Sequence, residues 1–253
     1  RRKRGLALVP LKFGISFTAT MLNQGGALLN IYMDGSVSCN HGGTEMGQGL
    51  NTKMAQVCAD GLGIGVDKVR ITATDSQKVP NASATSASSG ADINGAAIMN
   101  ATAQMRERLK PVAARMLGCS EADITFANSE AHGGGKSVKW EEVTKQAWLD
   151  RVGLSVAGFY MTPEIKYDFA TLTGHAFYYY CYGASVSEVE IDTRTGEWWL
   201  KAVDIVHDAG KSINPAIDKG QIEGGYVQGM GWLTMEECIW DKKGKFLTHG
   251  PST

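Results

Sequence analysis

The sequence lacks the cysteine patterns that build disulfide frameworks and metal centres. It has only five cysteines, an odd number, and no two of them form a C-x-x-C pair. This argues against a disulfide framework, a zinc site and an iron–sulfur cluster held by the chain itself. We expect most of the cysteines to be buried thiols in a reducing cytosol. They are Cys39, Cys58, Cys119, Cys181 and Cys238.

Long apolar runs and a strong net charge are also missing. No apolar stretch approaches the roughly 20 residues needed to span a bilayer, and no charged-then-apolar leader is present. The formal net charge is -1, which gives no global attraction to nucleic acid or anionic membranes. We interpret the one basic run, Arg1 to Arg4, as a solvated face or a segment boundary. These absences predict a soluble, cytoplasmic protein with no nucleic-acid or membrane partner.

Common catalytic and nucleotide-binding motifs are absent as well. The histidines form no i, i+4 pair for a metal, and there is no G-x-S-x-G elbow. The chain also lacks GxxxxGK[ST] and GxGxxG loops, which makes nucleoside triphosphates and NAD poor ligands for it. We therefore predict no catalytic residue and no metal bound by protein side chains, and we interpret His207 beside Asp208 as a satisfied core group.

The ends lack the usual marks of a whole protein. There is no initiator methionine, and the chain stops at the turn-like sequence Gly250-Pro251-Ser252-Thr253. We expect an excised piece of a longer protein. Its 253 residues fit one large domain or two intimate lobes.

Hairpins alternating with helices dominate the sequence pattern. Residues 27–40 predict two strands around Met33-Asp34-Gly35, since Asp-Gly between β-rich runs is a strong hairpin signal. A glycine loop follows, and then a helix over about 49–62. Residues 176–191 and 198–206 predict a second hairpin, followed by a loop over 208–215 and a helix that carries Gly225, Gln228 and Gly229.

The region between the two hairpins predicts a strand, two helices and a loose segment. Residues 69–74 alternate like a strand, and a helix starts near Ala91 and has Arg106, Arg108 and Lys110 near its far end. Residues 117–139 are rich in turns and contain the lobe boundary or exposed loop, if there is one, before a short helix over 140–149. The whole pattern predicts an α+β fold of twisted, mainly antiparallel sheets with packed helices, in two pseudo-repeated hairpin–loop–helix lobes.

Three helix openings rich in small residues are suited to a polar ligand. They read TSASSGAD over 85–92, GGTEMGQGL over 42–50 and QIEGGYVQGMG over 221–231. Ser and Gly before a helix expose backbone N–H groups to an anion, although they also serve as plain N-caps. Gln48 between glycines can donate and accept, or simply lie exposed at a close helix–sheet contact. Glu45 is either a general base or, more typically, a capping carboxylate, and Gln221 and Gln228 contact either a ligand or each other's loops.

Six motifs in order along the chain resemble one family. They are KFGISF (12–17), GGTEMGQGL (42–50), PNASATSASSGAD (80–92), GFYMTP (158–163), DAGKSINP (208–215) and GQIEGGYVQGMG (220–231). Together they resemble the molybdopterin-binding, C-terminal part of the large subunit in the xanthine dehydrogenase family of molybdenum hydroxylases, in its bacterial type. In that family molybdenum is held by the dithiolene of molybdopterin and by oxo, hydroxo and sulfido ligands.

The resemblance implies a set of site residues. Met46, Gly47 and Gln48 would contact the pterin and the metal's oxo ligand, and Gln221 would add a second amide. The tract Ala87, Ser88, Ser89, Gly90 and Ala91 would wrap the pterin and its phosphate. Phe17 would pack against the substrate ring, with Thr18 and Ala87 beside it.

The resemblance also implies what this piece would need from the rest of an enzyme. The family hydroxylates purines, such as hypoxanthine and xanthine to urate, with water as the oxygen source, and its base is a glutamate in a Gly-Glu-Pro-Pro context that this chain lacks. The [2Fe-2S] clusters, FAD and NAD of such an enzyme, and its first molybdenum lobe, would be bound or supplied outside residues 1–253, within an oligomer. This piece alone is therefore expected to be inactive. Two alternatives stay open: the same lobe of an aldehyde oxidase or another relative, and a cofactor-free scaffold.

Overall fold

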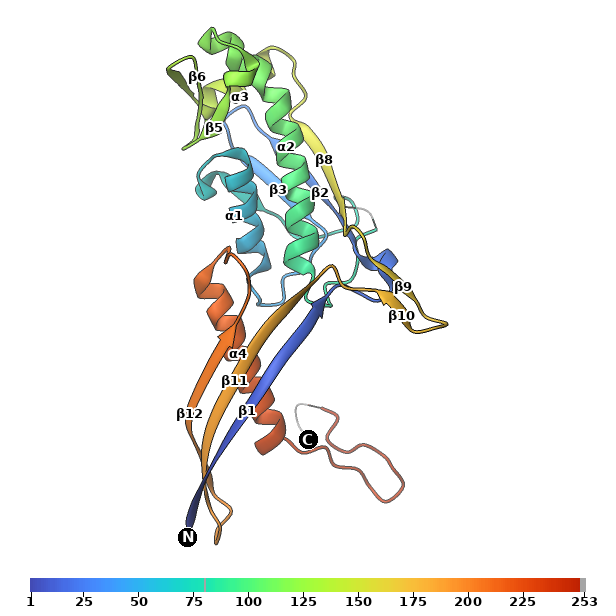
Figure 1. The fold of residues 1–253 in the computed structure, drawn as a ribbon. Helices are drawn as coiled ribbons and strands as arrows, with labels where there is room; N and C mark the ends of the chain where they lie inside the picture. Colours follow the sequence, from blue (N-terminus) through green and yellow to red (C-terminus); the bar gives the residue numbers. More distant parts are fainter. Residues whose placement is uncertain (80, 251–253) are drawn as a thin grey trace. The chain divides into compact units, whose positions relative to one another are not determined.

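The computed structural model describes residues 1–79 and 81–250 (Figure 1). Pro80, the first residue of the PNASATSASSGAD motif, and Pro251 to Thr253 of the expected terminal turn lie outside the described residues. The chain divides into two compact units, Arg1–Ile213 and Asn214–Thr253.

A four-stranded sheet forms the centre of the first unit. Its order is β4 (Val69–Ile71), β3 (Val37–His41), β2 (Gln24–Ile31) and β8 (Ser155–Met161), with β2 antiparallel to both β3 and β8, and β4 parallel to β3. Alternate residues of β2 are buried, as expected for a strand with one face on a core. The predicted first hairpin is confirmed.

Two helices cover one face of this sheet, α1 (Leu50–Leu62) and α2 (Gly90–Leu117) (Figure 1). The predicted 49–62 helix is confirmed, and so is the start of the second helix near Ala91. The second helix does not end near Lys110, because its apolar positions continue to Leu117, where Gly118 in the left-handed conformation ends it. Helices and sheet enclose a single buried cluster that includes Leu29, Met54, Leu62, Ile98, Met105 and Leu109.

The segment expected to be turn-rich contains three short strands. They are β5 (Thr125–Ala127), β6 (Glu130–Gly133) and β7 (Lys136–Lys139), an antiparallel sheet that is followed by α3 (Trp140–Leu149). Each strand has only three or four residues, too few to show an alternating pattern. Ile124, Phe126 and Trp140 belong to the same core as α1 and α2, and the division of the chain falls after Ile213. The predicted short helix over 140–149 is confirmed.

The second hairpin is part of a long three-stranded antiparallel sheet. β11 (Tyr179–Asp192) lies between β12 (Trp198–His207) and β1 (Arg2–Ile15), which the sequence did not predict as a strand (Figure 1). The basic run at the start of the chain lies on β1, where Arg2 pairs with Glu190 and Arg4 with Glu188 and Glu190. The run is therefore partly neutralised.

His207 does not lie in the core as expected. It is exposed at the end of β12, because this strand has a neighbour on only one side and most of its side chains reach solvent. The cysteines also differ from the expectation. Cys39 and Cys58 are buried, but Cys119 and Cys181 are half-buried and Cys238 is exposed; all five are free thiols.

The second unit is built on α4 (Pro215–Thr234), which begins at the predicted place. Asn214 caps it by accepting a hydrogen bond from the backbone N–H of Ile217 at 3.2 Å. Along the chain, the order hairpin, loop, helix thus occurs twice, as β2–β3–α1 and β11–β12–α4. The predicted α+β class is confirmed.

Short elements complete the chain. They are the 3-10 helices Thr20–Leu22, Val66–Lys68 and Glu121–Asp123, and the hairpin of β9 (Lys166–Asp168) with β10 (Thr173–His175). Among the helices of the described residues, none combines the length and the apolar character needed to cross a membrane.

Candidate cofactor-binding site

Glu45 organises the loop that precedes α1. Its carboxylate accepts hydrogen bonds from the backbone N–H groups of Gly47 at 2.9 Å, Gly49 at 3.1 Å and Asn51 at 2.9 Å. The bond from Asn51 is the main reason why the pKa of this carboxyl lies below its ordinary value. Asn51 lies in the first turn of α1, so the carboxylate caps one N–H group of the helix and also binds two N–H groups of the loop before it. The interpretation of Glu45 as a capping group is confirmed.

Gln48 folds back over the same loop. Its Oε1 accepts from the backbone N–H of Met46 at 2.5 Å, and its Nε2 donates to the carbonyl of Thr44 at 2.9 Å. A glutamine amide carries two N–H hydrogens, so one donor position of Nε2 is left for another acceptor. Met46 is exposed, and Gly47 adopts φ +91, a conformation that L side chains rarely take. The loop thus holds one half-buried amide in a fixed orientation.

His41 supports this loop from beneath, a role that sequence reasoning missed. The buried imidazole accepts from the backbone N–H of Gly43 through Nδ1 at 3.1 Å. Its proton therefore lies on Nε2, which donates to Oδ1 of Asn51 at 3.1 Å. Burial lowers the pKa of His41, so the ring is held neutral. The sequence indicates no such role for His41, because a histidine outside a metal-binding or catalytic motif gives no signal.

The second predicted tract, residues 85–91, has an unusual backbone. Ala87 and Ser88 are consecutive residues in the left-handed region, with φ values of 54 and 56. Such conformations carry a free-energy cost for non-glycine residues and persist only where the surroundings hold them. Ser89, the N-cap of α2, is buried, and its Oγ donates to the carbonyl of Ser86 at 3.1 Å. The tract ends at the first turn of α2, where backbone N–H groups have no acceptor within the helix.

The structure brings these two loops together. The backbone N–H of Thr44 donates to Oγ1 of Thr85 at 2.9 Å, and Thr74 Oγ1 donates to the carbonyl of Gly43 at 2.7 Å. A small hollow between the loops is lined by Gln24, Gly25, Gly42, Thr85, Ser89 and Gly90, among others.

Glycine is required where the loops approach each other. A Cβ on Gly43 would lie 2.5 Å from Leu50 Cδ2 and 2.7 Å from Asn94 Nδ2. A Cβ on Gly42 would lie 2.5 Å from the Cβ of Ala82. These two glycines are therefore required for the close packing of the loop against Leu50, Asn94 and Ala82.

Phe17 and Thr18 lie on a turn fixed by a single buried amide, Asn23. The Phe17 N–H donates to Asn23 Oδ1 at 2.8 Å, and Asn23 Nδ2 donates back to the Phe17 carbonyl at 2.9 Å. Both predicted substrate residues are half-buried. The turn leads directly into Gln24 and Gly25, which line the hollow beside the 85–91 tract. Asn23 was not singled out from the sequence, because an isolated asparagine gives no signal.

Gln221 lies in the second unit and is described with that unit alone. It is on α4, where its side chain is exposed, as is that of Gln228. The prediction that both belong to one helix is confirmed.

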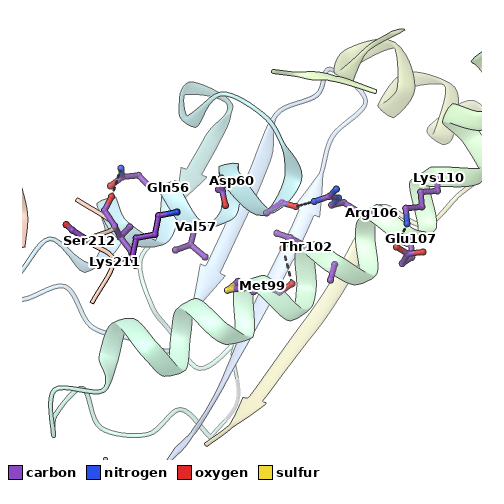
Figure 2. A pocket seen from close by; sticks show the side chains of 13 residues that line it. Gln56, Val57, Asp60, Met99, Thr102, Arg106, Glu107, Lys110, Lys211 and Ser212 are labelled. Carbon is purple, nitrogen blue, oxygen red and sulfur yellow. Dashed lines mark hydrogen bonds and ion pairs between the residues drawn. The ribbon is translucent and has the colours of Figure 1, made fainter. Parts of the chain in front are cut away.

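A larger cavity of about 770 Å³ lies elsewhere, between the outer surfaces of α1 and α2 and residues 211–213 (Figure 2). None of the predicted cofactor residues lines it. Among its charged side chains, Lys110 lies 2.6 Å from Glu107, and Arg106 Nη1 donates to the Gly61 carbonyl at 3.4 Å. Gln56 bridges to the Ile213 carbonyl at 3.3 Å. Nothing in its chemistry selects a ligand.

Protein side chains do not form a metal site in the part of the chain that the structure describes. No group of three or more His, Cys, Asp or Glu residues could hold a metal ion there. The donors gathered around the hollow are backbone N–H groups, hydroxyls and amides. Donors of this kind can hydrogen-bond to phosphate and heteroatom acceptors.

The family model of the molybdopterin cofactor-binding domain matches residues 1–253. The chain belongs to this family.

Its relatives include xanthine dehydrogenases. The chain is 48% identical over 252 residues to mouse xanthine dehydrogenase/oxidase and 45% identical over 259 residues to rice xanthine dehydrogenase, in each case over 100% of this chain and 18% of the relative. Quinoline 2-oxidoreductase from Pseudomonas putida 86 has a similar structure, with a TM-score of 0.85, 26% identity and coverage of 98% of this chain and 32% of that one. The chain therefore spans about a fifth of the length of the curated relatives.

Proposed function

We propose that this chain is the molybdenum-cofactor-binding segment of a xanthine dehydrogenase that hydroxylates purines with water as the oxygen source. The main support is the joining of the Gly42–Leu50 loop to the 85–91 tract through the hydrogen bond between Thr44 and Thr85. The 45–48% identity to xanthine dehydrogenases over the whole chain supports the same reading.

The cofactor residues would act through hydrogen bonds. In this proposal the backbone of Met46 and Gly47 and the second N–H of Gln48 Nε2 face the pterin and its metal, and Gln221 adds another amide. The Ala87 to Ala91 tract gives backbone and hydroxyl donors to the pterin and its phosphate. The group, when bound, supplies two-electron redox chemistry. In this proposal the polypeptide binds the pterin and the pterin binds the metal. The chain therefore needs no set of histidine or cysteine ligands.

The substrate and the rest of the enzyme belong to the proposal as well. Phe17 would present its ring to a flat heterocycle, with Thr18 and Ala87 at the edge of that contact. Because the chain covers 18% of its relatives, the [2Fe-2S] clusters, FAD, NAD, first molybdenum lobe, base glutamate and oligomer contacts would lie in other parts of the protein. The free thiols fit a reducing, cytoplasmic setting.

A second candidate substrate class is favoured by one observation. The similar structure at 26% identity is named for quinoline rather than a purine. An aldehyde oxidase or another relative would use the same cofactor loops, and the choice between them depends on residues near Phe17 and in other domains. Assays of the purified enzyme with xanthine, quinoline and an aromatic aldehyde separate these possibilities.

The decisive experiment uses the full-length enzyme that contains this chain. Molybdenum per protomer is measured by mass spectrometry, and turnover is measured with xanthine. Gln48→Ala should lower the molybdenum content or the turnover about tenfold or more, since a hydrogen bond to a charged or polarised group is lost. The matched control is Gln146→Ala, which removes a half-buried glutamine on α3 whose Nε2 donates to Asp150 at 2.9 Å. Wild-type molybdenum and rate in Gln48→Ala would refute the assignment of this loop, and a wild-type enzyme without molybdenum would refute the proposed function.

A further inference from the structure

Asp92 is a half-buried carboxylate for which the proposed function has no use. It is the third residue of α2 and directly follows the Ala87 to Ala91 tract. Burial raises the pKa of Asp92, and a hydrogen bond from Tyr179 opposes that effect. No lysine, arginine or histidine within residues 1–79 and 81–250 forms a recorded ion pair with it. The carboxylate is held by the helix N-terminus and by one phenol.

That phenol comes from a distant element. The hydroxyl of Tyr179 donates to Oδ2 of Asp92, across 87 positions of sequence. Tyr179 is the first residue of β11, and its partner across the sheet is Ile15, the last residue of β1. Ile15 lies two residues before Phe17. One hydrogen bond therefore connects the end of the expected cofactor tract with the strand pair that leads into the expected substrate turn.

The surroundings give Asp92 no second neutralising partner. Tyr160 on β8 and Cys181 on β11 both have raised pKa values, caused first by burial and to a smaller extent by the negative charge of Asp92. The pKa of Tyr179 is raised for the same reasons. These groups stay neutral near pH 7, so the Tyr179 hydroxyl is available as the donor. Removing it would leave a half-buried carboxylate without a side-chain donor, which costs more than an average hydrogen bond.

The neighbouring backbone needs such an anchor. Ala87 and Ser88 hold left-handed conformations that cost free energy, and the tract around them is bonded through Ser89 to the Ser86 carbonyl and through Thr85 to the Thr44 N–H. If the first turn of α2 could move, Ala87 and Ser88 could relax to less costly conformations.

We propose that the Asp92–Tyr179 hydrogen bond is a positioning pair that fixes the first turn of α2, and with it the strained 85–91 tract, relative to the strand pair that carries the Phe17 turn. The importance of this pair for cofactor retention rests on the proposed function, but its effect on the backbone does not.

The test uses the full-length enzyme, prepared both with and without its cofactor. Tyr179→Phe removes only the hydroxyl, and Asp92→Asn keeps an oxygen that can accept from Tyr179. In the cofactor-free enzyme, backbone amides of residues 86–91 should exchange with deuterium about tenfold faster or more in Tyr179→Phe, while those of residues 105–114 in the same helix stay unchanged. In the loaded enzyme Tyr179→Phe should lose molybdenum severalfold. Asp92→Asn should remain close to wild type in both measurements, whereas Asp92→Ala should match Tyr179→Phe.

The control is Tyr178→Phe, the same substitution one residue earlier, on a tyrosine that lies edge-to-face against Tyr179. Unchanged exchange at 86–91 in Tyr179→Phe would overturn the proposal, and so would equal loosening in Tyr178→Phe. Failure of Asp92→Asn to retain the wild-type exchange rate would also overturn it, because the charge rather than the hydrogen bond would then be the cause. If the wild-type enzyme held no molybdenum, the proposed function would fall while the exchange experiment still decided this inference.

Discussion

The backbone N–H of Thr44 donates to the side-chain hydroxyl of Thr85 at 2.9 Å, although the two residues are 41 positions apart. This bond joins the loop before α1 to the tract before α2. Gly42 of the first loop and Thr85, Ser89 and Gly90 of the second tract line one small hollow. Any ligand that uses both sets of backbone donors depends on this junction.

Thr85→Val should uncouple the two loops. Valine has nearly the shape of threonine but cannot accept a hydrogen bond, so the Thr44 N–H must turn to solvent. We expect a loss of about 0.5–1.5 kcal/mol in the local stability of this junction. Hydrogen exchange at residues 42–49 of the full-length enzyme measures it, together with molybdenum content. Thr85→Ser keeps a hydroxyl acceptor, so its exchange rate at residues 42–49 and its molybdenum content should equal those of the wild type. The control is Thr171→Val, which removes an exposed hydroxyl that bonds to Thr173. Equal exchange in Thr85→Val and wild type would mean that the junction is held by other contacts.

Glu45→Gln distinguishes a cap from a general base. Because Glu45 binds three backbone N–H groups of its own loop, its role is structural, and its lowered pKa makes it a poor base. We expect faster exchange at residues 47–51, corresponding to about 0.5–2 kcal/mol, with turnover per bound molybdenum within about twofold of wild type. Glu142→Gln, in the first turn of α3, is the control for a carboxylate near a helix start. A fall of kcat per molybdenum by two orders of magnitude or more would instead assign Glu45 to the chemistry.

Elements with a strong local pattern could be predicted from the sequence. The 27–40 hairpin, the helices over 49–62 and 140–149, and the strands over 176–191 and 198–206 carry their own periodicity or turn residues, and all of them are present. β1 was missed because its register depends on pairing with β11, more than 160 positions away, and no local signal encodes that partner. The β5–β6–β7 sheet was missed because its strands are too short for an alternating pattern.

In the candidate site, too, features with a local sequence pattern could be predicted and the others could not. Glycine, serine and amide content predicted the loops, and Glu45 was correctly interpreted as a cap. The supporting side chains His41, Asn23 and Tyr179 could not be found in this way. Their roles depend on folded geometry that no motif encodes: His41 bonds to Gly43 and Asn51, Asn23 bonds to Phe17, and Tyr179 bonds to Asp92 across 87 positions. Of the predicted cofactor residues, Ser89 and Gly90 line the hollow, whereas Met46, Gly47, Gln48, Ala87, Ser88 and Ala91 are not among its lining residues.

His41 gives the loop before α1 a dependence on pH. Burial lowers its pKa, so the unfolded or opened state binds more protons than the folded state between the lowered value and the ordinary value of about 6.5. Stability of the loop is therefore complete above about pH 6.5 and is lost as the pH falls below it. A hydrogen bond to Asn51 and the nearby charge of Glu45 oppose the shift without cancelling it.

The measurement is hydrogen exchange at residues 41–49 of the full-length enzyme at about pH 7.5 and 5.5, corrected for intrinsic exchange. The wild type should show an opening free energy that falls by up to about 1.4 kcal/mol per pH unit below 6.5. At the higher pH the loop of His41→Gln should exchange faster than that of the wild type, because the imidazole's hydrogen bonds to the Gly43 N–H and to Asn51 are lost or weakened. At the lower pH the exchange of this variant should change little further. If the wild type and His41→Gln respond to acid equally, another group controls the loop, and the neutral imidazole is not the reason for its order.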